Sequence, residues 1–300
     1  MTDKSSSASL RAAERYCRSY LSHYENFSLK SIFFPKDKFQ DLANIYAFCR
    51  YSDDLGDEGE VEGEAGRIAA LRKLDEWEKD LLKCPGRNSE HPILIALHET
   101  MAKFDLPLKP FRDLISAFRQ DQTKQRYSTF GELLDYCERS ANPVGRIYLM
   151  LFGIRDERWF ELSDKICTGL QLANFWQDVS VDIKKGRIYI PQEDLESFGY
   201  LERQLEEGIF NQKFRELMKF EVERTAGLFS EGSELESLLP SRLKLEVRLF
   251  RQGGEKVLEK ISGIGYDVVS RRPVISKFDK SLIFMKALIP RRSMGTGWKA

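Results

Sequence analysis

The sequence lacks the features that mark several common protein classes. Its five cysteines form no CxxC pair and are odd in number, which disfavours a disulfide framework and indicates reduced, buried thiols. The formal net charge is zero, whereas general nucleic-acid-binding proteins are normally basic. No run of about 18 apolar residues occurs, and the N-terminal stretch has no apolar core for a signal peptide. We therefore expect a cytoplasmic protein that binds no nucleic acid and does not span a membrane.

Strand patterns are also scarce, and Arg187–Pro191 (RIYIP) is the only short candidate. Composition instead favours a folded core, because 42% of the residues are hydrophobic and 31% are charged. The acidic stretch 57–66 is too short to separate domains. We expect one all-α domain over residues 1–300, with flexible tails at 1–8 and 291–300. Helical periodicity predicts helices over residues 7–24, 36–57, 64–83, 91–104, 108–122, 130–152, 158–185, 208–235, 241–263 and 276–288.

The C-terminal stretch Lys280–Arg292 mixes apolar residues with lysines and arginines. Two interpretations stay open for it. It is either a last helix packed on the core with a basic end, or an amphipathic helix in peripheral contact with a membrane surface.

The first motif with chemical content is Tyr46–Glu58, YAFCRYSDDLGDE. Asp53 and Asp57 are spaced i,i+4, so they share one helix face about 6 Å apart. Two like charges at this distance need a compensating cation, and Mg²⁺ suits such oxygen ligands. The alternative is a solvated acidic helix end.

The second motif is Gln171–Asp182, QLANFWQDVSVD, which repeats the i,i+4 aspartate spacing. Gln171, Asn174, Asp178 and Asp182 form one polar stripe on a helix that is otherwise apolar. Burying such a stripe is costly unless a ligand binds it. Two helices that each carry paired carboxylates could hold several divalent ions and neutralise a diphosphate leaving group. The alternative is two unrelated acidic faces.

Two arginines could bind the phosphate oxygens of such a substrate. Arg50 lies three residues before Asp53, and Arg187 follows Asp182 in KKGRIYIP. Guanidinium groups match phosphate geometry. Each arginine could equally form a salt bridge to its neighbouring aspartate, and such a bridge could open when substrate binds.

Three segments resemble the squalene/phytoene synthase family in order and spacing: YAFCRYSDDLGDE, DQTKQRYSTFGELLDYCERSANPVG and QLANFWQDVSVDIKKGRIYIPQEDL. The resemblance runs from about Tyr16 to Lys280. It implies an isoprenoid synthase helical bundle with a central cavity, Mg²⁺ as cofactor and a prenyl diphosphate as substrate.

The same resemblance implies roles for individual residues. The metal ligands are Asp53, Asp57, Asn174, Asp178 and Asp182. The substrate-binding residues are Arg50, Arg187, Asn174, Tyr189, His23 and Phe27. The catalytic residues are the four aspartates together with Tyr136, Gln171 and Tyr24. Both Tyr136 and Tyr189 could instead be core residues with one satisfied hydroxyl. His23 could instead be a structural hydrogen-bonding residue. Tyr24 or Asn26 could hold the water that quenches the cation.

A subgroup is suggested by HYENF (His23–Phe27), SANPVGR (Ser140–Arg146), NFWQDV (Asn174–Val179) and RQGGEKVLEKI (Arg251–Ile261). These are similar to hydroxysqualene synthases of the hopanoid pathway. That subgroup ionises presqualene diphosphate and captures the rearranged cation with water, without NADPH. Contact with other enzymes of the pathway is a further expectation. The alternatives are head-to-head condensation of farnesyl diphosphate, phytoene synthesis, and a non-catalytic helical scaffold.

Two departures from the family pattern stand out. Gln177 stands where the family often has an arginine, and Gly253-Gly254 replaces a position near which many members have a tyrosine. Glycine inside a helix costs about 1 kcal/mol relative to alanine. The pair therefore provides either room for a branched substrate or close packing between helices.

Overall fold

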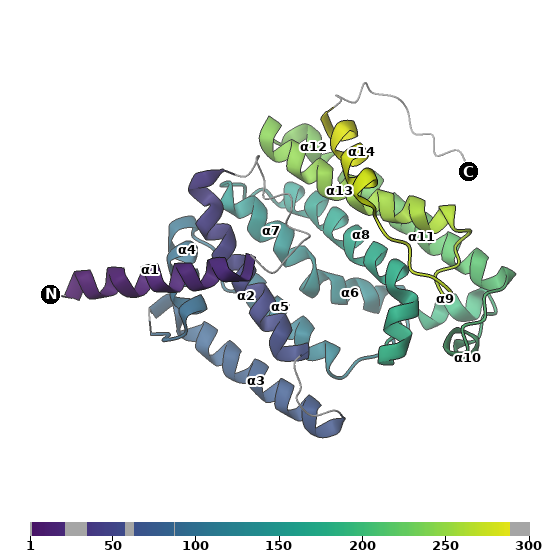
Figure 1. The fold of residues 1–300 in the computed structure, drawn as a ribbon, viewed down its shortest axis with the longest axis horizontal. Helices are drawn as coiled ribbons and strands as arrows, with labels where there is room; N and C mark the ends of the chain where they lie inside the picture. Colours follow the sequence, from purple (N-terminus) through teal and green to yellow (C-terminus); the bar gives the residue numbers. More distant parts are fainter. Residues whose placement is uncertain (1, 22–34, 58–62, 87, 289–300) are drawn as a thin grey trace. The chain divides into compact units, whose positions relative to one another are not determined.

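The computed structural model describes residues 2–21, 35–57, 63–86 and 88–288, and Figure 1 shows how its elements follow one another. Every regular element in these ranges is helical, which confirms the all-α prediction for them. The strand candidate Arg187–Pro191 forms no strand there. All five cysteines are free, and burial raises the pKa of Cys17 to about 12. Cys17, Cys84 and Cys137 are buried, as predicted, and Cys49 and Cys167 are half-buried.

The chain divides into two compact units. The first contains Met1–Tyr127 and Gly131–Cys167, and the second contains Ser128–Phe130 and Thr168–Ala300. One long helix, α8 (Glu157–Asp182), begins in the first unit and ends in the second. The expectation that one family domain covers the whole chain stays a prediction.

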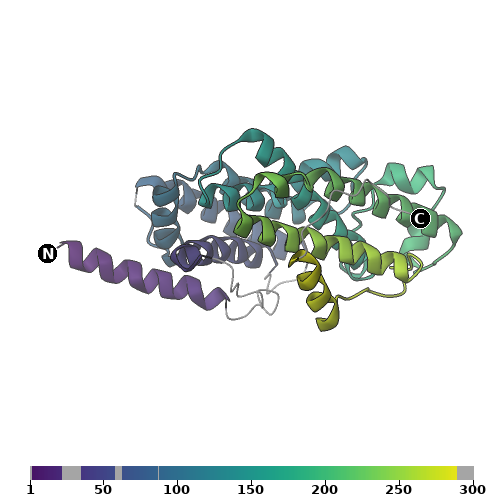
Figure 2. The ribbon, with the colours of Figure 1, turned by 90° about the horizontal axis from the view of Figure 1, so that it is seen from above.

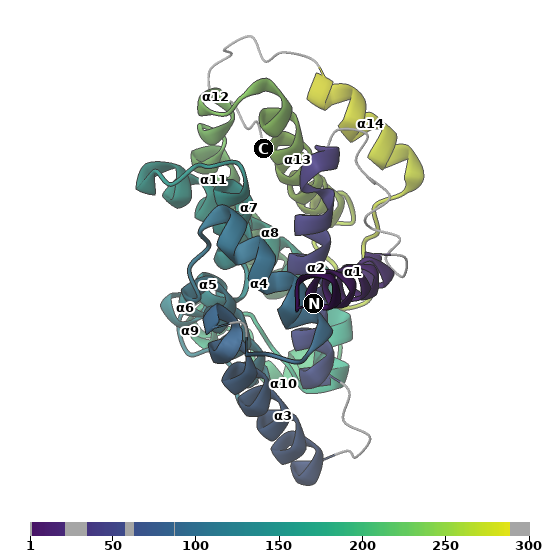
Figure 3. The same ribbon diagram turned by 90° about the vertical axis from the view of Figure 1, so that its left-hand side faces the viewer.

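The first unit is built around α2, whose buried residues pack against several neighbours. The helices of this unit, which can be followed in Figure 3 from purple to teal, are α1 (Thr2–Leu21), α2 (Phe39–Asp57), α3 (Glu64–Lys83), α4 (Pro92–Phe104), α5 (Lys109–Asp121), α6 (Phe130–Ser140) and α7 (Asn142–Leu151). Phe48 on α2 is fully buried, and its ring centroid lies 5.7 Å from that of Trp77 and 5.3 Å from that of Phe111. The Trp77 indole also donates a 2.8 Å hydrogen bond to Ser52 Oγ. These contacts fix α2 between α3 and α5.

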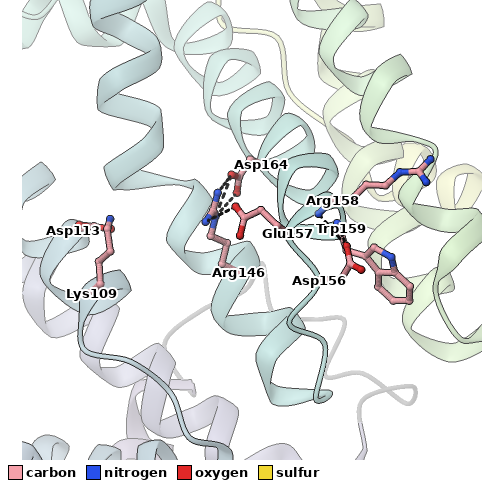
Figure 4. A network of polar contacts seen from close by, with 8 residues as sticks. All are labelled: Lys109, Asp113, Arg146, Asp156, Glu157, Arg158, Trp159 and Asp164. Carbon is pink, nitrogen blue, oxygen red and sulfur yellow. Dashed lines mark hydrogen bonds and ion pairs between the residues drawn. The ribbon is translucent and has the colours of Figure 1, made fainter.

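The single helix predicted over residues 130–152 is wrong, because the chain forms α6 and α7 with a break at Ala141. Pro143 lies in the first turn of α7, where its missing backbone N–H costs no hydrogen bond. In the interior of a continuous helix the same residue would remove such a bond and break the helix. The start of α7 is then held against α8. Arg146 Nη2 bonds Asp164 Oδ2 at 2.6 Å and Arg146 Nη1 lies 3.4 Å from Glu157 Oε1 (Figure 4). A Cβ on Gly145 would lie 2.5 Å from Cys167 Sγ, so α7 approaches α8 closely here.

The second unit continues from α8 through six further helices. They are α9 (Gln192–Ser197), α10 (Glu202–Glu206), α11 (Gln212–Gly232), α12 (Leu235–Leu238), α13 (Ser241–Gly263) and α14 (Lys277–Leu288). The helix α13 contacts α11, α12 and α14, and Figure 2 shows α13 in yellow-green followed by α14 in yellow. The predicted bounds 64–83 and 241–263 agree with α3 and α13, whereas α9 and α10 were not predicted. Within the described ranges, no helix is both long enough and apolar enough to cross a bilayer.

Candidate active site

The first aspartate motif lies on the last two turns of α2. The helix is continuous from Arg50 to Asp57, so Asp53 and Asp57 are one turn apart as predicted. Arg50 Nη1 lies 3.1 Å from Asp53 Oδ2, and Arg50 Nη2 lies 2.5 Å from Asp54 Oδ1. The side chain of Asp57 is outside the described part of the structure. Because the Arg50 side chain is 40% exposed, opening its ion pairs should cost little.

The end of α2 is anchored by a residue that the motif did not reveal. Gln122 is buried just after α5, and its Nε2 donates a 3.0 Å hydrogen bond to the carbonyl oxygen of Gly56. A Cβ on Gly56 would lie 3.1 Å from the same Nε2 atom, so a larger residue would press on this contact. Gln122 therefore holds the helical turn that carries Asp53 and Asp57.

The second motif forms the polar stripe that its spacing predicts. Asn174 is exposed and Gln171, Asp178 and Asp182 are half-buried. Most of the intervening side chains are buried, namely Leu172, Ala173, Phe175, Trp176, Gln177 and Val179, whereas Ser180 is half-buried and Val181 is exposed. Such a polar row on a well-packed helix presents oxygen atoms to a ligand at little cost to the core.

The two carboxylates of this stripe differ in their surroundings. Partial burial and the neighbouring charge of Asp178 raise the pKa of Asp182 to about 6. Asp178 itself is bound by both Nε and Nη2 of Arg272, and Nη2 lies 3.2 Å from Oδ2. Arg272 follows α13 in the segment before α14 and carries no recognisable motif, so sequence reasoning missed it. The structure therefore adds a third arginine to Arg50 and Arg187 as a group that could bind a diphosphate.

Gln177, the departure from the family's arginine, has a clear structural partner. Its Nε2 donates a 2.6 Å hydrogen bond to the carbonyl oxygen of Pro273, and its side chain is buried. This bond fastens the segment that contains Arg272 onto α8. Gln177 thus positions a cation beside Asp178 without supplying the charge itself.

Arg187 and Tyr189 lie directly after the second motif, where Gly186 turns the chain with a φ of 74°. The ring of Tyr189 stacks on Phe175 with centroids 3.7 Å apart, which is the core-type packing weighed for this tyrosine. Both residues line a small cleft, and Asp182 lines it as well. The cleft has room for little more than one water molecule, so it does not by itself hold a prenyl diphosphate.

Tyr136 lies on α6 and is almost fully buried. Its hydroxyl donates a 2.9 Å hydrogen bond to Asp121 Oδ2, and its ring lies 5.8 Å from that of Tyr127. The bond to Asp121 satisfies the Tyr136 hydroxyl, as expected if this tyrosine is a core residue. A direct role of Tyr136 toward substrate remains a prediction.

Three of the predicted residues, His23, Tyr24 and Phe27, lie outside the described residues. Within the described ranges, no three His, Cys, Asp or Glu side chains gather closely enough to form a metal site by themselves. The donor set still fits Mg²⁺, because Asn174, Asp178 and Asp182 offer only hard oxygen atoms. Mg²⁺ commonly keeps several waters and binds through one or two carboxylates plus substrate phosphates.

The two adjacent glycines of α13 have different explanations. A Cβ on Gly254 would lie 2.9 Å from Leu170 Cδ2 and 3.1 Å from Phe229 Cε1, and it would overlap Phe229 Cζ. A Cβ on Gly253 would meet no atom within 4 Å. Close packing of α13 against α8 and α11 therefore accounts for Gly254, and room for a substrate is not needed to explain it. The structure gives no packing reason for Gly253.

Comparisons with known proteins place this fold and its motifs in one family. The squalene/phytoene synthase family model matches residues 21–279. The squalene synthase HpnC from Alicyclobacillus acidocaldarius is 42% identical, with a TM-score of 0.80 over 86% of this chain and 95% of that one. A phytoene synthase from Arthrospira platensis is 31% identical over 92% of both chains. A dehydrosqualene synthase crystallised with a ligand is 24% identical, with a TM-score of 0.78 over 93% of this chain and 96% of that one, and supports the fold alone.

The fold is that of the all-α isoprenoid synthases. The chain belongs to the squalene/phytoene synthase family, whose members are enzymes that act on prenyl diphosphates.

Proposed function

We propose that this chain converts presqualene diphosphate and water into hydroxysqualene and diphosphate. The observation that carries a diphosphate-ionising role is the polar stripe of α8, with Asp178 and Asp182 one turn apart beside the buried side chains of Phe175, Trp176 and Val179. A squalene-type rather than a phytoene-type product is supported by the higher identity to a squalene synthase (42%) than to a phytoene synthase (31%). The HYENF and NFWQDV segments support the same choice.

The four aspartates and Asn174 are proposed to hold Mg²⁺, which would supply positive charge to stabilise the diphosphate as it leaves. Arg50, Arg187 and Arg272 would bind phosphate oxygens with charge-assisted hydrogen bonds. The carbon–oxygen bond to the diphosphate breaks, and its electron pair departs with the diphosphate. After the cyclopropyl cation rearranges, a water oxygen bonds to the cationic carbon and releases one proton. Aromatic rings such as Tyr136 and Tyr189 would favour a nearby cation by about 1–2 kcal/mol where water is excluded.

The proposal is tested by product analysis with presqualene diphosphate, Mg²⁺ and no reductant. We expect hydroxysqualene and an equal amount of diphosphate, unchanged by NADPH and abolished by a chelator. The variants Asp53→Asn and Asp178→Asn should lower turnover by at least a hundredfold while the folded state persists. The control is Asp80→Asn, which removes an exposed ion pair to Lys83 on α3 and should leave turnover unchanged. Squalene formed only with NADPH would contradict the water-quenching step.

Head-to-head condensation of two prenyl diphosphates is the second candidate, favoured by the 31% identity to a phytoene synthase over most of the chain. Incubation with farnesyl or geranylgeranyl diphosphate alone separates the two candidates. Consumption of either one would favour condensation. No diphosphate release from any prenyl diphosphate would favour a non-catalytic scaffold.

A further inference from the structure

The last described helix, α14, is held firmly on its inner side. Its single acidic residue, Asp279, is buried and lies 2.8 Å from Lys260 Nζ on α13. The same carboxylate accepts hydrogen bonds from the backbone N–H and hydroxyl of Ser276 at 2.8 and 2.6 Å, which caps the start of the helix. At the other end, Arg248 donates a 3.0 Å hydrogen bond to the carbonyl oxygen of Ala287. Helix α14 is therefore fixed to α13 at both ends.

Its outer side is apolar to a degree that the fold does not require. Phe278 is 72% exposed and Met285 is 63% exposed, and their spacing of seven residues places them on one face. Leu282 lies half-buried between them, and Val274, 60% exposed, stands just before the helix. Several large apolar side chains gathered on one exposed face are typical of a surface that meets another apolar phase.

The exposed charges of α14 itself all have the same sign. Lys277, Lys280 and Lys286 are exposed, and Asp279 is turned inward and neutralised. Around the helix, Lys277 and Lys286 lie on opposite sides of the row Phe278, Leu282 and Met285. We call these five residues the lysine-flanked face.

We infer that the lysine-flanked face docks onto an anionic lipid surface. The apolar row would enter the interface between headgroups and acyl chains, and the two flanking lysines would contact the phosphate layer. A second copy of the chain fits this face poorly, because a two-fold interface would bring two sets of lysines together. The inference rests on exposure and charge alone and is independent of the reaction.

The test measures binding of the full chain to vesicles by flotation. Vesicles of phosphatidylcholine alone are compared with vesicles of phosphatidylcholine and phosphatidylglycerol in equal amounts. We expect binding to the mixed vesicles, weakened by added salt. The double variant Lys277→Gln/Lys286→Gln should bind about thirty-fold more weakly at low salt, from about 1 kcal/mol per lysine. The matched control Lys73→Gln/Lys79→Gln, on exposed positions of α3, should bind as the wild type does.

The apolar part is tested with Phe278→Ser/Met285→Ser, and the control is Ile68→Ser, an apolar residue of α3 that is 60% exposed. Of these two, only Phe278→Ser/Met285→Ser should lose vesicle binding. Equal binding of all variants, or equal binding to both kinds of vesicle, would overturn the inference. A wild type that is dimeric without lipid and becomes monomeric through Phe278→Ser would also overturn it, because the face would then bind a second copy.

Discussion

Replacing Gly254 by alanine should leave the protein less stable than the same change at Gly253, which should stabilise it. Both residues lie in the interior of α13, so each substitution gains about 1 kcal/mol of helix propensity. Only at Gly254 does the new methyl group meet other atoms, with Leu170 Cδ2 at 2.9 Å and the Phe229 ring closer still.

The magnitude follows from the rigidity of the neighbours. Phe229 is fully buried, so its ring cannot swing into solvent to make room. Overpacking a well-filled core typically costs about 1–3 kcal/mol. The difference in unfolding free energy between the two variants should therefore be about 1–3 kcal/mol, since the helix propensity gain is common to both.

The assay is urea unfolding followed by circular dichroism, with both variants and the wild type measured together. We expect Gly253→Ala to have a higher urea midpoint than the wild type, and Gly254→Ala to have a lower midpoint than Gly253→Ala. The slope of the unfolding free energy against urea concentration should be similar for all three proteins. Adding Phe229→Leu to Gly254→Ala should recover part of the loss, because the smaller side chain relieves the overlap. Two variants of equal stability would refute the packing explanation for Gly254 and reopen the question of substrate room.

Three further outcomes are expected. Arg272→Gln should raise the KM for the prenyl diphosphate about tenfold or more, because it removes a charged partner at the Asp178 site, whereas Arg271→Gln should change steady-state kinetics little. Burial raises the pKa of Glu221 from 4.5 to about 8, so folding favours its protonated form and stability should fall as pH rises through this interval. Thermal unfolding of Glu221→Gln should show a smaller fall between pH 5 and pH 8; an unchanged slope would exclude this group as the cause. Gly145→Ala should lower the midpoint of thermal unfolding, because its Cβ would lie 2.5 Å from a sulfur atom of α8.

The long helices could be predicted because their periodic patterns end at clear signals. The bounds 64–83 and 241–263 agree with the structure for this reason. The segment 130–152 was misread because its apolar periodicity continues across Pro143, although a proline at this place is itself a signal for a helix break. The short helices α9 and α10 span too few residues to produce a periodic signal.

The residues of the candidate site likewise fall into those that a local sequence pattern predicts and those that it does not. The α8 stripe is a local pattern, so i,i+4 spacing was enough to predict it. Arg272 could not be predicted, because its partner Asp178 is 94 positions away in the chain. The meaning of Gly254 likewise depends on Phe229, which lies on another helix. Gly145 and Arg146 of the SANPVGR motif hold α7 against α8, so this part of the subgroup signature reflects packing.

The bond from Gln177 to Pro273 joins α8 to the segment that leads into α14. Arg272 forms an ion pair with Asp178. Ser276, a few residues further along the same segment, caps the start of α14. If docking of α14 shifts this short segment, it alters the cation beside Asp178. Thermodynamic reciprocity then requires that a ligand at Asp178 change the lipid affinity of α14 by the same factor. Under that condition, membrane attachment and occupancy of the site would be thermodynamically coupled.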